Sequence, residues 1–321
     1  MSKYSTVIIG TGSYLPERIL SNEELATKVD TNDEWIISRT GIKQRHIVAE
    51  NELTSDMAYM AAKRAIESAK ITPKDIGMII VCTTTADKSF PSVAVSVQAK
   101  LGINNIPAFD MQAVCAGFVY GITMADNFIK TGFAKTILVI GAESMSKLVN
   151  WQDRNTCVLF GDGAGAVILQ AHESHEGIIA CKINADGAFE SILNTDGGIS
   201  LNQSTGFIQM SGRDVFKHAV EKMSRTIGDL LEISKYKKDD LNWIIPHQAN
   251  ARIISAIATK LEFAEDKMVV TLDKQANTSA ATIGLALDHH VKAGMIKSND
   301  LIMITALGAG LTWGGCLLRW L

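Results

Sequence analysis

The feature that most constrains the fold of this chain is an internal repetition. The segment KDIGMIIVCTTT, which begins at Lys74, resembles KDDLNWIIPHQ, which begins at Lys238. Farther along, FIKTGFAKTILVIGAES from Phe128 resembles HVKAGMIKSNDLIMITALG from His290. Both pairs keep one order and are separated by about 165 residues, roughly half of the 321-residue chain. Short matches can arise by chance, but a shared order and nearly shared offset favour two related halves.

Strand-like and helix-like segments alternate along the chain. Residues 78–83, 137–141 and 164–169 are short apolar runs bounded by Gly, Asp or Thr, which is typical of buried strands. Residues 54–69 and 116–130 instead repeat apolar positions with the period of a helix. This alternation predicts an α/β architecture.

The repetition also pairs two polar residues. Cys115 lies 17 residues before Gly132, and Asn277 lies 17 residues before Gly294, the matched glycine of the second half. Each residue therefore belongs where a strand ends and a helix begins, at equivalent places in the two halves. Because pseudo-twofold symmetry would bring these helix starts together, we expect Cys115 and Asn277 to face one chamber.

Composition disfavours several classes of protein. The formal net charge is −3, so there is no electrostatic footprint for nucleic acid. The apolar run at residues 7–9 is too short for a signal peptide, and no stretch approaches the roughly 20 apolar residues that cross a bilayer. An odd number of cysteines without a C-x-x-C pair favours a reducing cytoplasm over disulfides or zinc. His172 and His175 lack further ligands, so we expect no metal. The cysteines are Cys82, Cys115, Cys157, Cys181 and Cys316.

Two side chains at predicted strand ends could perform chemistry. Cys115 follows IPAFDMQAV and opens a helix, whose amino terminus would lower the thiol pKa and favour the nucleophilic thiolate. His247 follows the strand-like NWII, at the end of a strand where α/β folds place their sites. In isolation each has an ordinary structural alternative, because a buried Cys is commonly inert and His247 or Asn277 could cap the next helix.

Two glycine-rich segments differ in what they predict. Gly308, Ala309 and Gly310 follow the apolar LIMITA, where small residues let backbone N–H groups approach an oxyanion or simply form a tight turn. The segment at 161–165 matches neither the phosphate loop nor the dinucleotide fingerprint, so we interpret it as a structural turn.

Several motifs form an ordered set over nearly the whole chain. They are the Cys-Ala-Gly helix start, Pro-His-Gln-Ala-Asn, Asn-Thr-Ser-Ala-Ala and the glycine-rich loop before Leu-Thr-Trp-Gly, with DEWIISRTGIKQRHI, Phe-Pro-Ser and the segment at 161–166. This set resembles the β-ketoacyl-[acyl-carrier-protein] synthase III family. The resemblance implies an α/β, thiolase-like fold with duplicated βαβαβαββ halves in five layers (α-β-α-β-α). We place these halves at residues 1–172 and 173–321.

The resemblance also implies the activity. It is the decarboxylative Claisen condensation of an acyl-CoA, with acetyl-CoA as the expected primer, and malonyl-acyl-carrier protein, which initiates type II fatty-acid synthesis in a homodimer. The catalytic triad of the family falls on Cys115, His247 and Asn277. Cys115 would carry the acyl group, while His247 and Asn277 would donate hydrogen bonds to the malonyl thioester oxygen. Backbone N–H groups of Cys115 and Ala309 would hold the acyl-transfer oxyanion. Acyl-CoA is a substrate, and no permanently bound cofactor is implied.

Other matched positions are binding residues in the family. For coenzyme A they are Trp35, Arg39, Arg154 and Asn250, and for the acidic carrier protein they are Lys217, Gln248, Arg252 and Lys260. Phe90 matches a residue that reaches into the acyl pocket of the partner subunit. The chain departs from the family at Ala276 and Ala309, where glycine is usual, so we expect an altered rate or pocket shape but not loss of activity.

Three alternatives remain at this point. A biosynthetic thiolase would place a second Cys just before the closing loop, where this chain has Thr305, Ala306 and Leu307. A related condensing enzyme or acyltransferase of secondary metabolism would keep the same motifs. A catalytically inactive scaffold is disfavoured because the Cys, His and Asn are intact.

Overall fold

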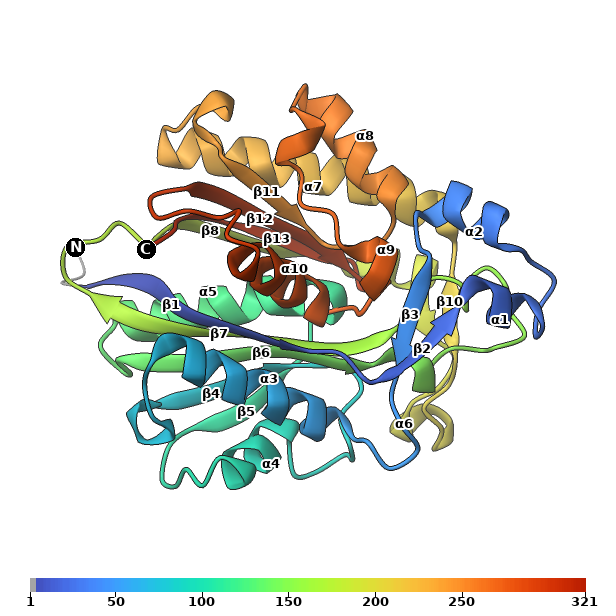
Figure 1. The fold of residues 1–321 in the computed structure, drawn as a ribbon, viewed down its shortest axis with the longest axis horizontal. Helices are drawn as coiled ribbons and strands as arrows, with labels where there is room; N and C mark the ends of the chain where they lie inside the picture. The colour runs from blue at the N-terminus through green and yellow to red at the C-terminus, as the bar shows by residue number, and fades with distance from the viewer. Residues whose placement is uncertain (1–3) are drawn as a thin grey trace.

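The protein, described here by a computed structural model of residues 4–321, is built from five alternating layers of helices and sheets (Figure 1). Two sheets each have helices on both faces, and a pair of helices lies between them. This is the five-layer α/β arrangement that the sequence predicts. From one outer layer to the other, the helices are α3 (Thr54–Ala69) and α4 (Val93–Lys100), then α5 (Gly117–Lys130) and α10 (Ala281–Lys292), then α7 (Gly212–Ser234) and α8 (Ala251–Leu261).

The strands of the two sheets come from different parts of the chain. The first sheet has the order β1-β7-β6-β4-β5, in which β4 is parallel to β6 and β5 and the β7 pairings are antiparallel. The second has the order β11-β12-β13-β8, with only the β11–β12 pair parallel. Their bounds are β1 Ser5–Tyr14, β4 Met78–Cys82, β5 Ala108–Met111, β6 Thr136–Ser144, β7 Asp162–His172, β8 Ile178–Ala185, β11 Trp243–Pro246, β12 Leu301–Gly308 and β13 Thr312–Arg319.

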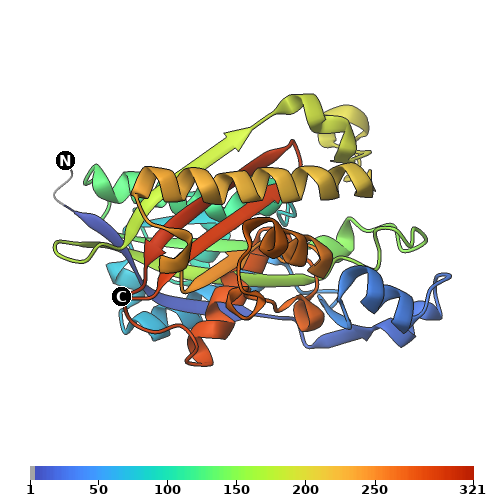
Figure 2. The same ribbon diagram turned by 90° about the horizontal axis from the view of Figure 1, so that it is seen from above.

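Shorter elements lie at one end of the molecule, beside the carboxyl ends of the parallel strands. Viewed from above, α7 lies across the second sheet, and the short elements gather toward the right-hand end of the molecule (Figure 2). They are β2 (Arg18–Ser21), α1 (Asn22–Ala26), α2 (Asp33–Thr40), β3 (Gln44–Ile47), β9 (Leu193–Thr195), α6 (Ile199–Asn202), β10 (Ile208–Met210) and α9 (Leu272–Gln275).

The central helix α5 is held between the sheets by an apolar stripe at the helical period. Phe118, Ile122, Ala125 and Ile129 are fully buried in one cluster that also contains residues of both sheets. On the opposite side of the helix Asn127 is exposed, so the apolar stripe determines which face is buried. The helix begins at Gly117, one residue later than the sequence predicts, because a short 3₁₀ turn (Val114–Ala116) precedes it.

The second central helix, α10, approaches the first sheet through glycines. A Cβ atom added to Gly165 would lie 2.5 Å from the backbone carbonyl carbon of Gly284, so no larger residue fits without movement. The prediction that residues 161–165 form a turn is therefore wrong, because Asp162 begins β7. These glycines let the backbone of the helix approach the backbone of the strand closely, which is a known reason for glycine within a strand.

We predict that Gly165→Ala destabilises the protein by about 1–3 kcal/mol, because the added methyl group forces two backbones apart. The matched control is Gly228→Ala in α7, where an added Cβ meets nothing within 4 Å. That change should stabilise by about 0.5–1 kcal/mol through helix propensity. Urea unfolding of both variants measures the difference, and equal stabilities would contradict the packing described.

Candidate active site

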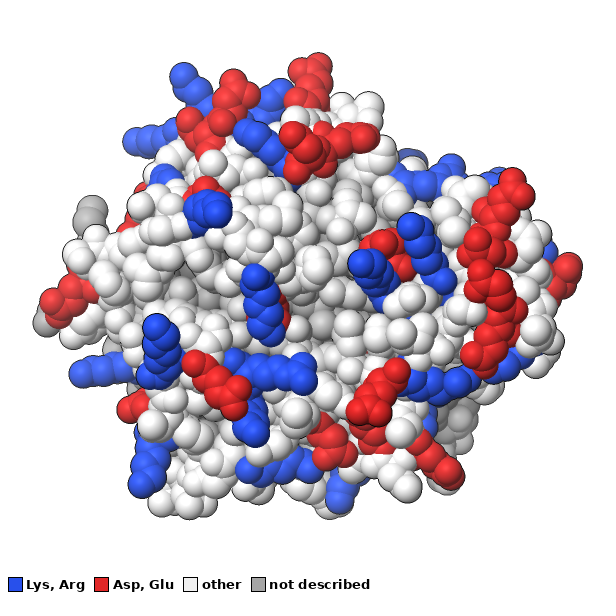
Figure 3. Space-filling model, viewed as in Figure 1, with Lys and Arg blue, Asp and Glu red and all other residues white. Residues whose placement is uncertain are grey.

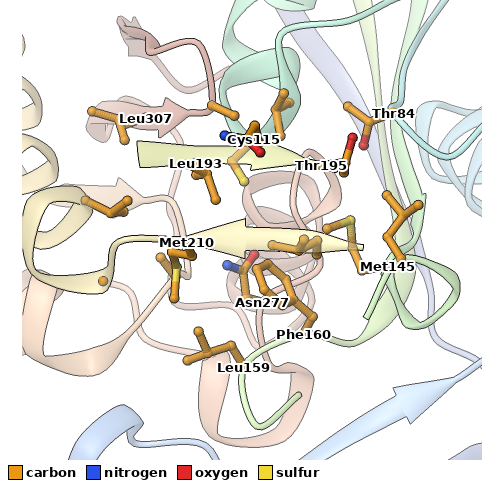
Figure 4. Close-up of a pocket in the computed structure, with 18 of the residues that line it drawn as sticks. Thr84, Cys115, Met145, Leu159, Phe160, Leu193, Thr195, Met210, Asn277 and Leu307 are labelled. Atoms are coloured by element: carbon orange, nitrogen blue, oxygen red, sulfur yellow. The ribbon is translucent and has the colours of Figure 1, made fainter. Parts of the chain in front are cut away.

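One cavity of about 910 Å³ is lined by Cys115, His247 and Asn277. Figure 4 shows Cys115 and Asn277 in this cavity, surrounded by largely apolar side chains from both halves of the chain. The sequence prediction that Cys115 and Asn277 face one chamber is confirmed. His247 reaches the same chamber from the end of β11.

Cys115 lies in the 3₁₀ turn that leads into α5. Val114, immediately before it, has a φ of 48°, which is unusual for a β-branched residue and is a mark of strain next to a functional group. The Cys115 side chain is buried, and this burial raises the pKa of the thiol to about 12. The prediction of a lowered thiol pKa is therefore wrong for the closed cavity, because the cost of removing a thiolate from water is larger than the benefit of the helix terminus.

His247 is held neutral by its surroundings. Its side chain is almost fully buried, and this burial lowers the pKa of the imidazole to about 3. Nδ1 lies 2.7 Å from the hydroxyl of Thr282, which is also 3.1 Å from the carbonyl oxygen of Ser279. The hydroxyl has a single proton, which it can donate either to Nδ1 or to the Ser279 carbonyl oxygen. When Thr282 donates to Nδ1, the ring proton is on Nε2 and available to a ligand. His247 does not cap the following helix, since Asn250 does so.

Asn277 is fixed by three hydrogen bonds. Its backbone N–H donates to Leu159 and its carbonyl accepts from Gly161, at 2.9 and 3.0 Å. Its Oδ1 accepts from the N–H of Ser279 at 2.9 Å. This bond assigns the side-chain oxygen and leaves the Nδ2 protons for a ligand. Asn277 is not the cap of α10, because that helix has Ala280 in the N-cap position.

The closing loop packs directly on the backbone of Cys115. A Cβ atom on Gly308 would lie 2.7 Å from the Cys115 backbone nitrogen, so glycine is needed there. The Thr312 hydroxyl lies 2.8 Å from the carbonyl oxygen of Ala113 and 3.1 Å from that of Ala309. Gly310 has a φ of 128°, whereas Ala309 is outside the positive-φ region. Alanine at position 309 therefore presents its backbone N–H without the strain of a left-handed backbone conformation.

Ala276 differs from Ala309 in its backbone. It has a φ of 56° and a ψ of −166°, a conformation that non-glycine residues adopt at a cost of about 1–3 kcal/mol. The side chain is fully buried directly before Asn277. Alanine at this position therefore stores strain beside the site.

Sequence reasoning missed the polar residues beneath the triad. Thr282 contacts His247, and Ser279 contacts both Asn277 and the buried carboxylate of Glu143. Ser279 lies within the Asn-Thr-Ser-Ala-Ala motif, and Glu143 lies at the end of the repeated ILVIGAES segment. Both residues therefore lie in segments that stand out in the sequence. A serine or a glutamate by itself, however, indicates no function until the helices are brought together.

Three of the four residues matched to coenzyme A binding line the cavity, and the fourth, Arg154, lies against one of them. The guanidinium of Arg154 is 5.0 Å from the centre of the Trp35 ring, and the two side chains come from segments far apart in the sequence. Trp35, Arg39 and Asn250 line the cavity. The side-chain nitrogen of Asn250 donates to the carbonyl of Arg39 at 3.1 Å, which joins α8 to the end of α2.

The residues matched to carrier-protein binding do not all reach the surface. Lys217, Arg252 and Lys260 are exposed on α7 and α8. Gln248 is fully buried, and its side chain bonds to the backbone of Pro246, Val269 and Thr271. The assignment of Gln248 to the docking surface is therefore wrong, because a buried amide that holds three backbone groups cannot contact a partner.

Phe90 is the most exposed large apolar side chain among residues 4–321, with 84% of its surface accessible. It lies in the loop between β4 and α4. Within the same described residues, there is no cluster of three or more His, Cys, Asp and Glu side chains that could hold a metal ion. None of the helices between Tyr4 and Leu321 combines the length and apolar character required to cross a bilayer.

A five-layer duplicated fold, with a buried cysteine facing a histidine and an asparagine, defines a condensing enzyme of the thiolase-fold class. Two models of one family match the chain: 3-oxoacyl-[acyl-carrier-protein] synthase III over residues 109–187 and the C-terminal part of the same synthase over residues 231–320. The chain belongs to this family. It is an acyltransferase-type condensing enzyme, and it carries out the condensation that initiates fatty-acid synthesis.

Individual relatives agree with this assignment. The chain is 54% identical to a β-ketoacyl-[acyl-carrier-protein] synthase III of Wolbachia pipientis, over 100% of both chains. Its structure resembles that of 3-oxoacyl-[acyl-carrier-protein] synthase III from Aquifex aeolicus, with a TM-score of 0.94, 48% identity and coverage of 98% of this chain and 100% of that one. The priming β-ketosynthase of the R1128 polyketide pathway has a TM-score of 0.94 at 32% identity, covering 98% and 96% of the two chains.

Proposed function

We propose that Cys115, His247 and Asn277 catalyse this condensation, with an acyl-CoA as the first substrate and malonyl-acyl-carrier protein as the second. Acetyl-CoA is the proposed primer. The observation that supports these roles is that the three side chains line one enclosed cavity although they come from three distant segments. The arrangement suits a two-stage reaction, in which the cysteine holds the acyl group between the stages.

In the first stage, the Cys115 sulfur attacks the carbonyl carbon of the acyl-CoA thioester. The new C–S bond forms as the carbonyl becomes an oxyanion, and the backbone N–H groups of Cys115 and Ala309 stabilise this charge. The bond to the coenzyme A sulfur then breaks, and coenzyme A leaves as a thiol. Gly308 supports this assignment, because its lack of a side chain lets the closing loop approach the Cys115 backbone.

In the second stage, malonyl-acyl-carrier protein enters and loses CO₂. The electron pair left on carbon is delocalised onto the thioester oxygen, where Nε2–H of His247 and Nδ2–H of Asn277 donate hydrogen bonds. The carbanion then attacks the acyl group on Cys115, the bond to the Cys115 sulfur breaks, and the thiolate that leaves takes up one proton from solvent to restore the thiol. A neutral histidine suits this role, and the burial that lowers its pKa to about 3 keeps it neutral at physiological pH. Each such donor contributes about 3–4 kcal/mol to a transition state of this kind.

The mouth of the cavity would hold the coenzyme A arm. Trp35 and Arg154 present a planar ring and a guanidinium, and both surfaces stack on a purine base. Arg39 and Asn250 line the same cavity as Trp35 and Cys115. We propose all four as coenzyme A contacts.

The carrier protein would dock on basic side chains beside the mouth. Lys217 on α7 and Arg252 and Lys260 on α8 are exposed, and the guanidinium of Arg252 is 6.0 Å from the ring of Phe216. The face shown in Figure 3 has interspersed acidic and basic side chains around a broad uncharged area. The proposed docking contacts are these three exposed basic side chains. Thr259, which lacks a charge, weakens this surface.

A homodimer would use the open edge of the first sheet. Strand β5 ends that sheet, and its Asp110 accepts hydrogen bonds from the backbone of Val93 and Ala94 at 2.7 and 2.8 Å. These bonds join the edge strand to the segment that carries exposed Phe90. An unpaired strand and a protruding aromatic side chain suit pairing with a second copy. We propose that Phe90 then enters the acyl pocket of the partner.

The proposed halves, 1–172 and 173–321, meet between the sheets. The first sheet uses strands within residues 5–172 and the second uses strands within residues 178–319. Helix α10 of the second half packs on β7 and β1 of the first, so the halves are not independent bodies. All five cysteines are free, which supports the proposed cytoplasmic location.

We predict that Cys115→Ser abolishes the acyl-enzyme, whereas His247→Ala and Asn277→Ala leave acylation largely intact and suppress malonyl decarboxylation. Removal of one donor should lower decarboxylation by roughly 10²–10³-fold. Intact-mass spectrometry after exposure to a panel of acyl-CoAs measures the first stage and identifies the primer, and CO₂ release measures the second. Loss of acylation in either alanine variant would refute this division of roles. Acylation of an alcohol or amine in place of the malonyl unit would favour secondary metabolism.

We predict that Arg252→Glu raises the KM for malonyl-acyl-carrier protein on the order of tenfold, because it reverses a charge at the docking surface. Acylation by acyl-CoA should not change. The matched control is Lys63→Glu, an exposed charge reversal on α3 in the opposite outer layer. Equal effects of the two variants would show that net charge, and not this surface, determines docking.

We also predict a dimer in solution at micromolar concentration. Sedimentation equilibrium should give twice the 34.7 kDa mass of one chain. A concentration-independent monomer that retains full activity would rule out the proposed role of Phe90 in a partner subunit.

A further inference from the structure

A fully buried carboxylate is joined to the site by hydrogen bonds and has no part in the mechanism above. Glu143, at the end of β6, is inaccessible to solvent. Its Oε2 accepts hydrogen bonds from the Thr84 N–H at 3.1 Å and the Thr85 hydroxyl at 2.6 Å, and its Oε1 accepts one from the Ser279 hydroxyl at 3.0 Å. Burying a carboxylate is costly, but hydrogen bonds to a charged acceptor are stronger than those between neutral groups. Glu143 therefore holds the groups around it firmly in place.

Ser279 connects this carboxylate to Asn277. The backbone N–H of Ser279 donates to Oδ1 of Asn277 at 2.9 Å, and within residues 4–321 this is the only hydrogen bond of the Asn277 side chain. The direction of the Asn277 amide therefore depends on the position of the Ser279 backbone. That backbone has a φ of 50°, a conformation that a non-glycine residue keeps only when its surroundings hold it. The bond from the Ser279 hydroxyl to Glu143 supplies such a hold.

The same serine reaches His247 by a second path. The carbonyl oxygen of Ser279 accepts a hydrogen bond from the backbone N–H of Thr282 at 3.3 Å. The hydroxyl of Thr282 lies 2.7 Å from Nδ1 of His247. Ser279 thus contacts one donor of the second stage directly and the other through one residue, while its own side chain is anchored on Glu143.

We propose that Glu143 is a positioning residue which, through Ser279, aligns Asn277 and His247 for the decarboxylation stage. It touches neither the substrate nor the reacting atoms. The inference rests on the roles proposed above for Asn277 and His247. Hydrogen-bond donors stabilise a developing oxyanion fully only when their directions are set before the reaction, and a misplacement of about 1 Å lowers a rate by up to about 10²-fold. Loss of the anchor should therefore slow the release of CO₂ more than it slows acylation.

Two substitutions remove the anchor in different ways. In Glu143→Gln the Thr84 N–H can only donate, so the amide oxygen stays beside it and the NH₂ group turns toward Ser279, whose hydroxyl loses its charged acceptor. Ser279→Ala removes only the hydroxyl and leaves the backbone N–H and carbonyl that serve Asn277 and Thr282. If Glu143→Gln does not fold, Ser279→Ala decides the outcome.

The experiment mixes pre-formed acyl-enzyme of the full-length protein with malonyl-acyl-carrier protein and measures CO₂ release against the concentration of the carrier protein. Because the acyl group is already in place, the rate of acylation does not enter this measurement. Glu143→Gln and Ser279→Ala should each lower the maximal rate by about tenfold. The half-saturating concentration should not change, since the aligned donors act in the transition state. The double variant should equal the single ones, because both changes interrupt one path.

A matched control tests whether any lost buried carboxylate has this effect. Asp288 is fully buried in α10, the helix that follows Ser279, and accepts hydrogen bonds from the hydroxyls of Thr11 and Ser13 on β1. Asp288→Asn should leave the rate of CO₂ release from the acyl-enzyme unchanged even where unfolding by urea shows lost stability. A tenfold loss in this variant as well would overturn the specific role of Glu143.

A full rate of CO₂ release in Ser279→Ala would overturn the positioning role and leave Glu143 as a structural tie between β6 and the loop at 83–85. Equal slowing of acylation and CO₂ release would also overturn it, because that result indicates general damage to the site. His247→Ala and Asn277→Ala in the same assay separate this inference from the proposed function. If those two variants release CO₂ normally, the proposed function fails. If they are slow while Glu143→Gln and Ser279→Ala are not, the positioning role alone fails.

Discussion

The contact between the amino-terminal ends of α5 and α10 is the constraint on which the rest of the structure depends. A Cβ atom on Gly117 would lie 3.5 Å from that of Ala280, and one on Gly141 would lie 2.3 Å from the Ala280 carbonyl oxygen. Small residues on both sides therefore let the two helix starts meet between the sheets. That meeting places Cys115, from the first half, opposite Asn277, from the second. It also explains why glycines occur within buried strands, where they otherwise weaken a sheet.

Burial then determines the protonation state of the groups that meet there. The same exclusion of water raises the pKa of Cys115 and Glu143 and lowers that of His247, so the resting site favours neutral thiol and imidazole groups. A neutral, enclosed site suits the reaction, because hydrogen bonds to a developing oxyanion are stronger where water does not compete. It also makes removal of the thiol proton the difficult step. The helix terminus alone does not offset the cost of ionising a buried thiol.

Several predictions from the sequence were correct because they rested on periodicity and spacing. The helix at Thr54–Ala69, the strand centres within β4, β6 and β7, and the shared chamber of Cys115 and Asn277 all follow from local patterns repeated in two halves. The predictions that were wrong concerned residues whose role depends on their surroundings in the folded protein. Gln248 stands in a correctly matched motif, but only the packing shows that its amide binds backbone groups inside the protein. The glycines at 161–165 were expected in a turn because their contact with α10 is formed across more than 100 residues of sequence.

The sequence by itself determined the family and the alternation of helices and strands, and it predicted the three side chains that we propose to be catalytic. It could do so because apolar periodicity and short motifs are local properties of a chain. The tertiary structure decided the protonation states, the direction of each hydrogen bond and which polar residues support the triad. These depend on desolvation and on neighbours from distant segments, as with Glu143 of the first half and Ser279 of the second. Neither the desolvation nor these contacts between distant segments exist until the two halves have packed together.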